Sequence, residues 1–306
     1  MTSPPADNPV KGMALMASCM LVLPIMDAIA KFMATVETMS PAQVTFYRFF
    51  FQFAALLPAM VYATRGRWAV KRPWMNLLRG AVHGAASLMF FVAVKYMPLA
   101  DVFAIYFVEP FMLTLMSAVF LGDSVGWRRW TAIAVGFSGA MIVIQPSYAI
   151  FGATALLPIA CAFLFTIYLF MNRALGDGDS PLAMQTFAGL GGTLFCAAAL
   201  ALGSGMDVQN FEIALPASGR GIVLLALLGA ISGYIHLVVV RAFRLAPLSL
   251  LAPFQYFEII SATVLGYALF DEFPTVSKWL GIAIIVASGL FIIWRERVRL
   301  AQSPPS

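Results

Sequence analysis

The longest uncharged stretch of the chain, residues 130 to 172, limits the fold more than any other feature. It contains no Asp, Glu, Lys or Arg, and an apolar run of about 18 residues is already long enough to cross a bilayer as a helix. Of the 306 residues, 61% are hydrophobic and 11% are charged, whereas a soluble domain carries about 25% charged residues. The sequence therefore predicts an all-α membrane protein, embedded in the lipid bilayer.

Charges, Pro, Gly and Asn divide the apolar sequence into segments of helix length. The uncharged stretch itself should form two helices, interrupted around Gln145-Pro146-Ser147 and Gly152. The sequence thus predicts ten transmembrane helices, at 12–33, 41–63, 74–95, 99–121, 129–145, 152–172, 181–203, 219–241, 247–270 and 276–295.

Lysine and arginine are distributed unevenly over the segments that connect these helices. If the N-terminus lies in the cytoplasm, thirteen of them fall on inside segments, and the outside segments hold Lys31, Lys95, Arg220 and Lys278. Positive residues concentrate on the cytoplasmic side of membrane proteins, so both termini are expected inside. Membrane topology also explains the net charge of +5, and nucleic acid is set aside as a partner.

The chain contains a tandem repeat, because residues 80–130 match residues 229–279 when the sequence is shifted by 149 positions. The matched pairs are Gly80 and Gly229, Gly84 and Gly233, Lys95 and Arg244, Pro98 and Pro247, Glu109 and Glu258, Asp123 and Glu272, and Trp130 and Trp279. Five helices per repeat is an odd number, so the second copy should cross the membrane upside down. Such inverted repeats are typical of secondary transporters.

Motifs in both halves resemble the drug/metabolite transporter superfamily, EamA type. They are Met97-Pro98-Leu99-Ala100 before a helix that ends Phe120-Leu121-Gly122-Asp123, the echoes Ala246-Pro247-Leu248-Ser249 and Leu269-Phe270-Asp271-Glu272, Ser40-Pro41 with Arg48, and Arg79-Gly80. The resemblance covers about residues 12–296. It implies a tail at 1–11, five-helix repeats at 12–145 and 152–295, and a tail at 296–306.

The resemblance also implies a function and a location. It implies a multi-pass transporter of the bacterial inner membrane that is not an enzyme and uses no cofactor. In such proteins the first, third, fourth, sixth, eighth and ninth spans line the cavity, while the fifth and tenth lie at the periphery. This chain departs from the pattern, because many relatives carry a small or apolar residue where it has Glu109 and Glu258.

These two glutamates are single charges in the middle of apolar helices, where a carboxylate is costly and often functional. Tyr106 shares a helix face with Glu109, and Pro110 should free a backbone carbonyl one turn back. One interpretation is a substrate or proton site in two distorted helices. The alternative is a protonated, hydrogen-bonded glutamate that fixes helix packing.

Aromatic residues are dense on the same two helices. A stripe formed by Phe103, Phe107 and Phe111 should face lipid or neighbouring helices. Side chains with a hydroxyl or amide need a partner, and so the expected cavity residues are Tyr106, Gln255 and Tyr256.

Three more charged residues lie within the predicted helices. Asp27 is a candidate for the substrate site, with a solvated position at the mouth as the alternative. Arg48 cannot lose its charge, and we expect a structural ion pair with Glu109 or Asp27, or else contact with substrate. Arg79 is close enough to a basic loop to extend its guanidinium into water.

His83 and His236 lie in the middle of the third and eighth predicted helices. Histidine titrates near neutrality, so a proton relay is one interpretation, and a hydrogen bond across helices is the other. Cys19, Cys161 and Cys196 lie in apolar runs without paired spacing, and the sequence contains no metal-ligand cluster or phosphate loop. We therefore expect no metal.

The leading functional hypothesis is a carrier of a small-molecule substrate that works by alternating access, with a proton as a candidate coupling ion. The sequence resembles family members that import riboflavin or S-adenosylmethionine. The first candidate substrate is a flat, vitamin-like heterocycle such as riboflavin. The rival is an exporter of amino acids, amines or organic cations. An alternative of another class is a membrane-embedded enzyme or lipid-handling protein with Glu109 and Glu258 as acid and base. Assembly as a homodimer is left open.

Overall fold

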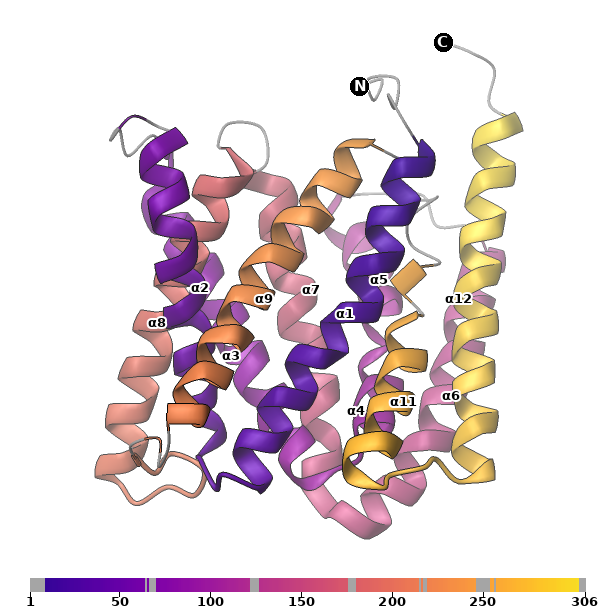
Figure 1. The fold of residues 1–306 in the computed structure, drawn as a ribbon. Coiled ribbons are helices and arrows are strands. Elements are labelled where there is room, and N and C mark those ends of the chain that lie inside the picture. The colour runs from indigo at the N-terminus through magenta and orange to yellow at the C-terminus, as the bar shows by residue number, and fades with distance from the viewer. Residues whose placement is uncertain are drawn as a thin grey trace.

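The computed structural model describes residues 9–63, 65, 70–121, 127–175, 180–214, 216, 219–245, 254–255 and 257–302. Throughout this part of the chain the regular elements are helices, and they run side by side as one bundle (Figure 1). Their bounds are α1 Pro9–Thr35, α2 Pro41–Ala63, α3 Pro73–Tyr96, α4 Leu99–Tyr106, α5 Glu109–Leu121, α6 Trp127–Phe151, the 3-10 helix η1 Gly152–Leu156, α7 Leu157–Leu175, α8 Pro181–Gly205, α9 Gly219–Leu245, α11 Phe257–Phe270 and α12 Val276–Gln302.

Within the described ranges, six helical stretches are long and apolar enough to cross a membrane. They are Val10–Thr35, Pro41–Ala63, Pro73–Tyr96, Ser147–Asn172, Pro181–Gly205 and Gly219–Val239. Shorter apolar helices cover Ala134–Val143, Phe257–Phe270 and Val276–Ser288. The all-α class with several membrane spans is therefore confirmed, and the count of ten spans remains a prediction.

The helix expected at 99–121 is divided into α4 and α5. The backbone N–H of Phe107 donates to the carbonyl of Phe103 at 3.0 Å, and Val108 donates to Ile105 at 3.2 Å, which closes α4 with a turn. Pro110 has no N–H to donate to the carbonyl one turn back. The distortion expected before Pro110 is therefore confirmed.

The helix expected to end at residue 145 runs further. α6 continues through Pro146 to Phe151, and the chain then turns at Gly152 with φ +60°. Glycine adopts a positive φ at little steric cost. The predicted interruption around Gln145-Pro146-Ser147 and Gly152 therefore falls at Gly152, and the predicted helix end at residue 145 was too early.

Two GxxxG runs bring helices of opposite halves of the sequence close together. α3 packs on α8, and α9 packs on α2. A Cβ at Gly80 would collide with the backbone of Ala188, and one at Gly229 would meet Phe51 and the carbonyl of Arg48. The glycines are therefore packing residues that allow close backbone approach.

The outer layer and the two ends of the bundle are visible in Figure 1. α6 and α12 pair along one edge of the bundle, consistent with the peripheral position expected for the fifth and tenth spans. The first turn of α1 and the last turn of α12 lie at the same end, and the connection from α11 to α12 lies at the opposite end (Figure 1).

Candidate functional site

Glu109 and Glu258 occupy equivalent places, in the first turn of α5 and of α11. Both side chains are buried, with 5% and 7% of their surface exposed. The N-terminus of a helix carries a partial positive charge that favours a carboxylate there. The first turn of each helix therefore places one acid inside the bundle.

Asp27 joins the two glutamates from α1. It is 2% exposed, so the alternative of a solvated position at the mouth was wrong. Glu258 interacts electrostatically with both Asp27 and Glu109, and Tyr106 interacts with all three. We call these three acids and the tyrosine the acidic cluster: Asp27, Tyr106, Glu109 and Glu258.

Two carboxylate oxygens of this cluster have no hydrogen-bond partner among the described residues. They are Oδ2 of Asp27 and Oε1 of Glu109, and none of the three acids pairs with a basic side chain in the part of the chain that the structure describes. A buried acceptor without a donor is costly. The cluster can therefore accept hydrogen bonds from a ligand.

Arg48 has different partners from those expected. Its Nε donates to Oγ of Ser232 at 3.2 Å, another guanidinium nitrogen donates to Oγ of Ser87, and the guanidinium lies over the rings of Phe49 and Phe91. It interacts electrostatically with Asp27. The expected ion pair with Glu109 or Asp27 was wrong, because hydroxyl groups on α3 and α9 occupy its donors.

His83 and His236 lie beside Arg48, with 5.1 Å between their ring centroids. Nε2 of His83 is 3.4 Å from Arg48, whose guanidinium has no lone pair, so this nitrogen must accept and the proton must be on Nδ1. That buried Nδ1 has no partner among the described residues. His236 bonds the carbonyl of Ser232 in its own helix at 2.8 Å, so the expected bond across helices is not made by this residue.

Arg79 does not extend into water. Its side chain is fully buried, donates to Oδ1 of Asn172 and to the carbonyl of Met184 at 2.5 Å, and lies over the ring of Tyr168. The expectation of a solvated guanidinium was wrong, because α7 and α8 supply acceptors inside the bundle.

A row of rings connects the acidic cluster to the histidines. Tyr106 contacts Phe165 at 5.9 Å between centroids, Phe165 contacts Tyr168 at 5.3 Å, and Tyr168 stacks on His83 at 4.4 Å. Gln255 is half-buried in the short segment before α11, and Tyr256 lies outside the described residues. The stripe of Phe103, Phe107 and Phe111 is buried against neighbouring helices and does not face lipid.

The structure also contains two buried ion pairs that sequence reasoning missed. Lys31 pairs with Glu272 at 2.5 Å, and Lys278 pairs with Asp101. Lys31 and Lys278 were counted as loop charges, and Asp101 was not considered. The signal that could have found them is their place at the ends of apolar helices, where a charge is either solvated or paired.

The described residues contain no group of three or more His, Cys, Asp or Glu side chains arranged to hold a metal ion. The acidic cluster lies among apolar helices that are long enough to span a membrane. This arrangement is typical of multi-pass membrane proteins that bind a solute within the helix bundle. The model of the EamA-like transporter family matches residues 10–145 and again residues 152–294. The chain belongs to the EamA-like transporter family.

Curated relatives are similar over nearly the whole chain. An S-adenosylmethionine uptake transporter of Rickettsia prowazekii is 26% identical, with 92% of each chain covered. A riboflavin transporter of Rhizobium johnstonii is 25% identical, with 96% of this chain and 94% of the relative covered. The pseudopaline exporter CntI of Pseudomonas aeruginosa is 23% identical over 72% of each chain.

A solved crystal structure shares the fold, with a TM-score of 0.59 over 94% of this chain and 99% of the other, at 17% identity. The family and its named members make this protein a small-molecule transporter of the membrane and not an enzyme. The alternative of a membrane-embedded enzyme is therefore set aside.

Proposed function

We propose that this transporter carries a small organic cation with a heterocyclic ring, and that S-adenosylmethionine is the first candidate substrate. The observation that carries the proposal is the acidic cluster. Asp27, Glu109 and Glu258 are buried together without a basic partner among the described residues. A cation inside a low-dielectric bundle needs such a counter-charge.

Each part of S-adenosylmethionine has a suitable group in the bundle. The sulfonium and the ammonium suit the carboxylates of the acidic cluster. The adenine ring suits the row formed by Tyr106, Phe165 and Tyr168, since stacked rings contribute about 0.5–1.5 kcal/mol beyond the area that they bury. The α-carboxylate suits Arg48, whose charge has no carboxylate partner among the described residues.

Riboflavin is the second candidate. The same row of rings suits a flat, neutral heterocycle, and riboflavin transporters are among the relatives. A neutral ligand would bring no positive charge to the three acids, whereas a cation would. We therefore place the cation before riboflavin as the candidate substrate.

We further propose that the chain forms two inverted five-helix repeats, 12–145 and 152–295, in the bacterial inner membrane with both termini cytoplasmic. The packing supports this proposal. α3 packs on α8, and α9 packs on α2. If the two halves of the chain exchanged places, each of these two contacts would become the other. The starts of α5 and α11 would be interconverted in the same way, and each carries one glutamate.

A proton is the coupling ion that we propose. A carboxyl group that binds a cation must be ionised, and the same group can carry a proton after the cation has left. Substrate and proton would therefore compete for the acidic cluster, which couples their movements in opposite directions.

Uptake into sealed proteoliposomes tests the proposed substrate. Labelled S-adenosylmethionine should enter, and unlabelled S-adenosylmethionine should compete at a concentration about tenfold lower than S-adenosylhomocysteine, which lacks the sulfonium charge. Liposomes with Glu109→Gln are the matched control. Uptake of riboflavin without uptake of S-adenosylmethionine would favour the second candidate, and equal competition by both adenosyl compounds would count against a cation site.

A further inference from the structure

Two ion pairs connect distant parts of the sequence at one end of the bundle. Lys31, near the end of α1, meets Glu272, which follows α11, and Lys278 of α12 meets Asp101 in the first turn of α4. Lys31, Asp101 and Lys278 are buried, and Glu272 is mostly so. Glu272 lies in the connection from α11 to α12, and Lys278 lies in the first turn of α12. This connection is at the end of the bundle opposite the first turn of α1 and the last turn of α12 (Figure 1).

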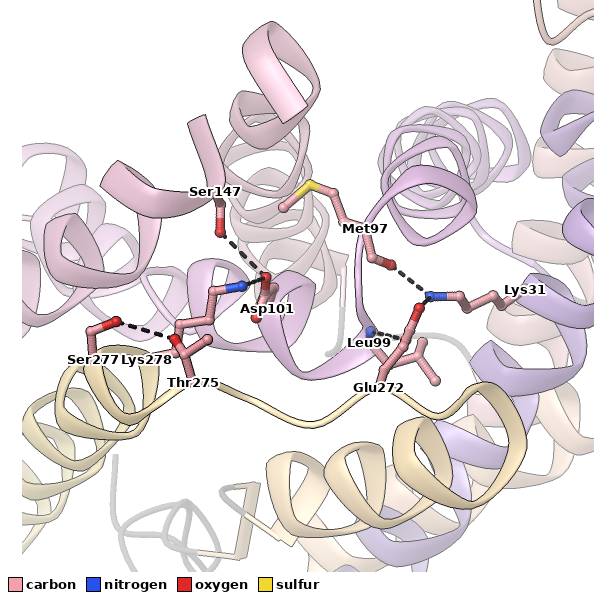
Figure 2. A network of polar contacts seen from close by, with 9 residues as sticks. All are labelled: Lys31, Met97, Leu99, Asp101, Ser147, Glu272, Thr275, Ser277 and Lys278. Atoms are coloured by element: carbon pink, nitrogen blue, oxygen red, sulfur yellow. Dashed lines mark hydrogen bonds and ion pairs between the residues drawn. The ribbon is translucent and has the colours of Figure 1, made fainter. Parts of the chain in front are cut away.

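Each pair is fixed further by backbone or hydroxyl groups. Lys31 donates to the carbonyl of Met97 at 2.8 Å, and Glu272 accepts from the N–H of Leu99 at 3.3 Å. Figure 2 shows both contacts. Ser147 donates to Asp101 at 3.3 Å. The network therefore holds α1, the turn between α3 and α4, the end of α6 and the connection from α11 to α12 together.

We propose that Lys31, Asp101, Glu272 and Lys278 form a latch that closes this end of the transport path and separates whenever the path opens there. The inference rests on the proposed transport function and on the hypothesis that transport works by alternating access. α1 carries both Lys31 and Asp27, and α11 carries Glu258 and leads directly to Glu272. Any movement of α1 from α11 that exposes the acidic cluster from this end must therefore separate Lys31 from Glu272.

Ion pairs are suited to a latch that opens repeatedly. Desolvation offsets much of the attraction in a buried pair, and water hydrates both charges again once they separate. The pairs can therefore favour the closed arrangement without holding it permanently, while the loss of one partner leaves a buried charge unpaired and favours opening.

The sequence contains no matching latch at the other end. The shift of 149 positions places Asp123 and Arg129 at the positions of Glu272 and Lys278, but it places Ser180 and Leu250 at the positions of Lys31 and Asp101. The repeated motif therefore lacks both partners there. We infer that the latch biases the resting protein toward closure at the end that carries it.

Cys161 of α7 is a native reporter for this inference. It is buried, and it interacts electrostatically with Asp27 and Glu109 of the acidic cluster. With Cys19→Ala and Cys196→Ala it is the single thiol of the chain. A membrane-impermeant methanethiosulfonate is added to one face of sealed vesicles at a time, so that the readout needs neither substrate nor a known orientation.

Asp101→Asn and Glu272→Gln should each increase the labelling rate of Cys161 from one face by about tenfold. Exchange of the second pair, Asp101→Lys with Lys278→Asp, should restore slow labelling, because the hydroxyl of Ser147 can donate or accept. Lys95→Met is the matched control. It removes a cation whose partner at 2.9 Å is the neutral side chain of Asn210, and it should leave the rate unchanged.

Slow labelling of Cys161 in both single variants would overturn the latch. Labelling of the exchanged variant as fast as that of the single variants would also overturn it. Glu272→Gln decides the matter if Asp101→Asn does not reach the membrane, since Glu272 is the most exposed of the four. The wild type could fail to transport S-adenosylmethionine while the variants label at the predicted rates. That outcome would refute the proposed substrate and leave the latch standing.

Discussion

Arg48 of α2 donates from Nε to Oγ of Ser232 on α9, with 3.2 Å between the two atoms, and Ser232 in turn donates to Oε1 of Gln52 at 2.9 Å. All three side chains are buried. One hydroxyl thus satisfies a donor and an acceptor on the neighbouring helix. Arg48 therefore connects α2 to α9, and it forms no ion pair with an acidic side chain of the described residues.

The first prediction follows from this contact. Ser232→Ala should lower the free energy of unfolding by about 1–3 kcal/mol, because it leaves a buried donor and a buried acceptor unpaired. Thermal unfolding in detergent measures the change. Ser138→Ala is the control, since Ser138 is exposed and bonds the carbonyl of Val135 in its own helix. Equal shifts in the two variants would contradict the role of Ser232.

The second prediction concerns the glutamates in the first turns of α5 and α11. Glu109→Gln and Glu258→Gln keep the shape of the side chain but delete its charge, so uptake should fall by about 10- to 100-fold, the factor expected for loss of a charged hydrogen bond. Expression and thermal stability should stay near wild type. Glu212→Gln, in an exposed loop, is the control. Normal uptake by both variants would refute the acidic cluster as the substrate site.

The third prediction concerns helix packing. Gly80→Ala should lower stability by about 1–3 kcal/mol, the usual cost of overpacking, because its Cβ would meet the backbone of Ala188. The control is Gly205→Ala, which has nothing within 4 Å of the new methyl group. Detergent melting curves compare the two. A folded Gly80→Ala protein as stable as Gly205→Ala would show that α3 and α8 can move apart freely.

The fourth prediction concerns orientation. If both termini are cytoplasmic, a cysteine at Ser204 in a chain without its native cysteines should react with an impermeant thiol reagent added to intact spheroplasts. A cysteine at Thr64 should not react until the membrane is opened. The expectation rests on the excess of Lys and Arg in the segments assigned to the inside. The opposite labelling pattern would invert the topology.

Much of the fold follows from the sequence because membrane helices obey simple limits of length and polarity. The apolar runs gave the class, and Pro110 gave the break between α4 and α5. The end of α6 was misplaced because a proline and a glycine lie close together in the sequence. Only the backbone conformation of Gly152 shows which of the two ends the helix.

The site was partly predictable for a similar reason. A carboxylate inside an apolar helix is conspicuous, so Asp27, Glu109 and Glu258 could be selected one by one. The partners of a buried charge lie on other helices, and sequence spacing contains no information on them. This is why Arg48 was assigned an acid although it bonds hydroxyl groups, and why Asp101 and Lys278, 177 positions apart, were not recognised as a pair.

The most direct test of the central claim is the ratio of the affinity for S-adenosylmethionine to that for S-adenosylhomocysteine, measured on purified wild type and on Asp27→Asn, Glu109→Gln and Glu258→Gln. The two ligands share every group except the methyl that makes the sulfur positive. We predict a ratio of about ten or more for the wild type, and a ratio that falls toward one as the acids are neutralised. A ratio that is the same in the wild type and all three variants would contradict a cation site built from these carboxylates.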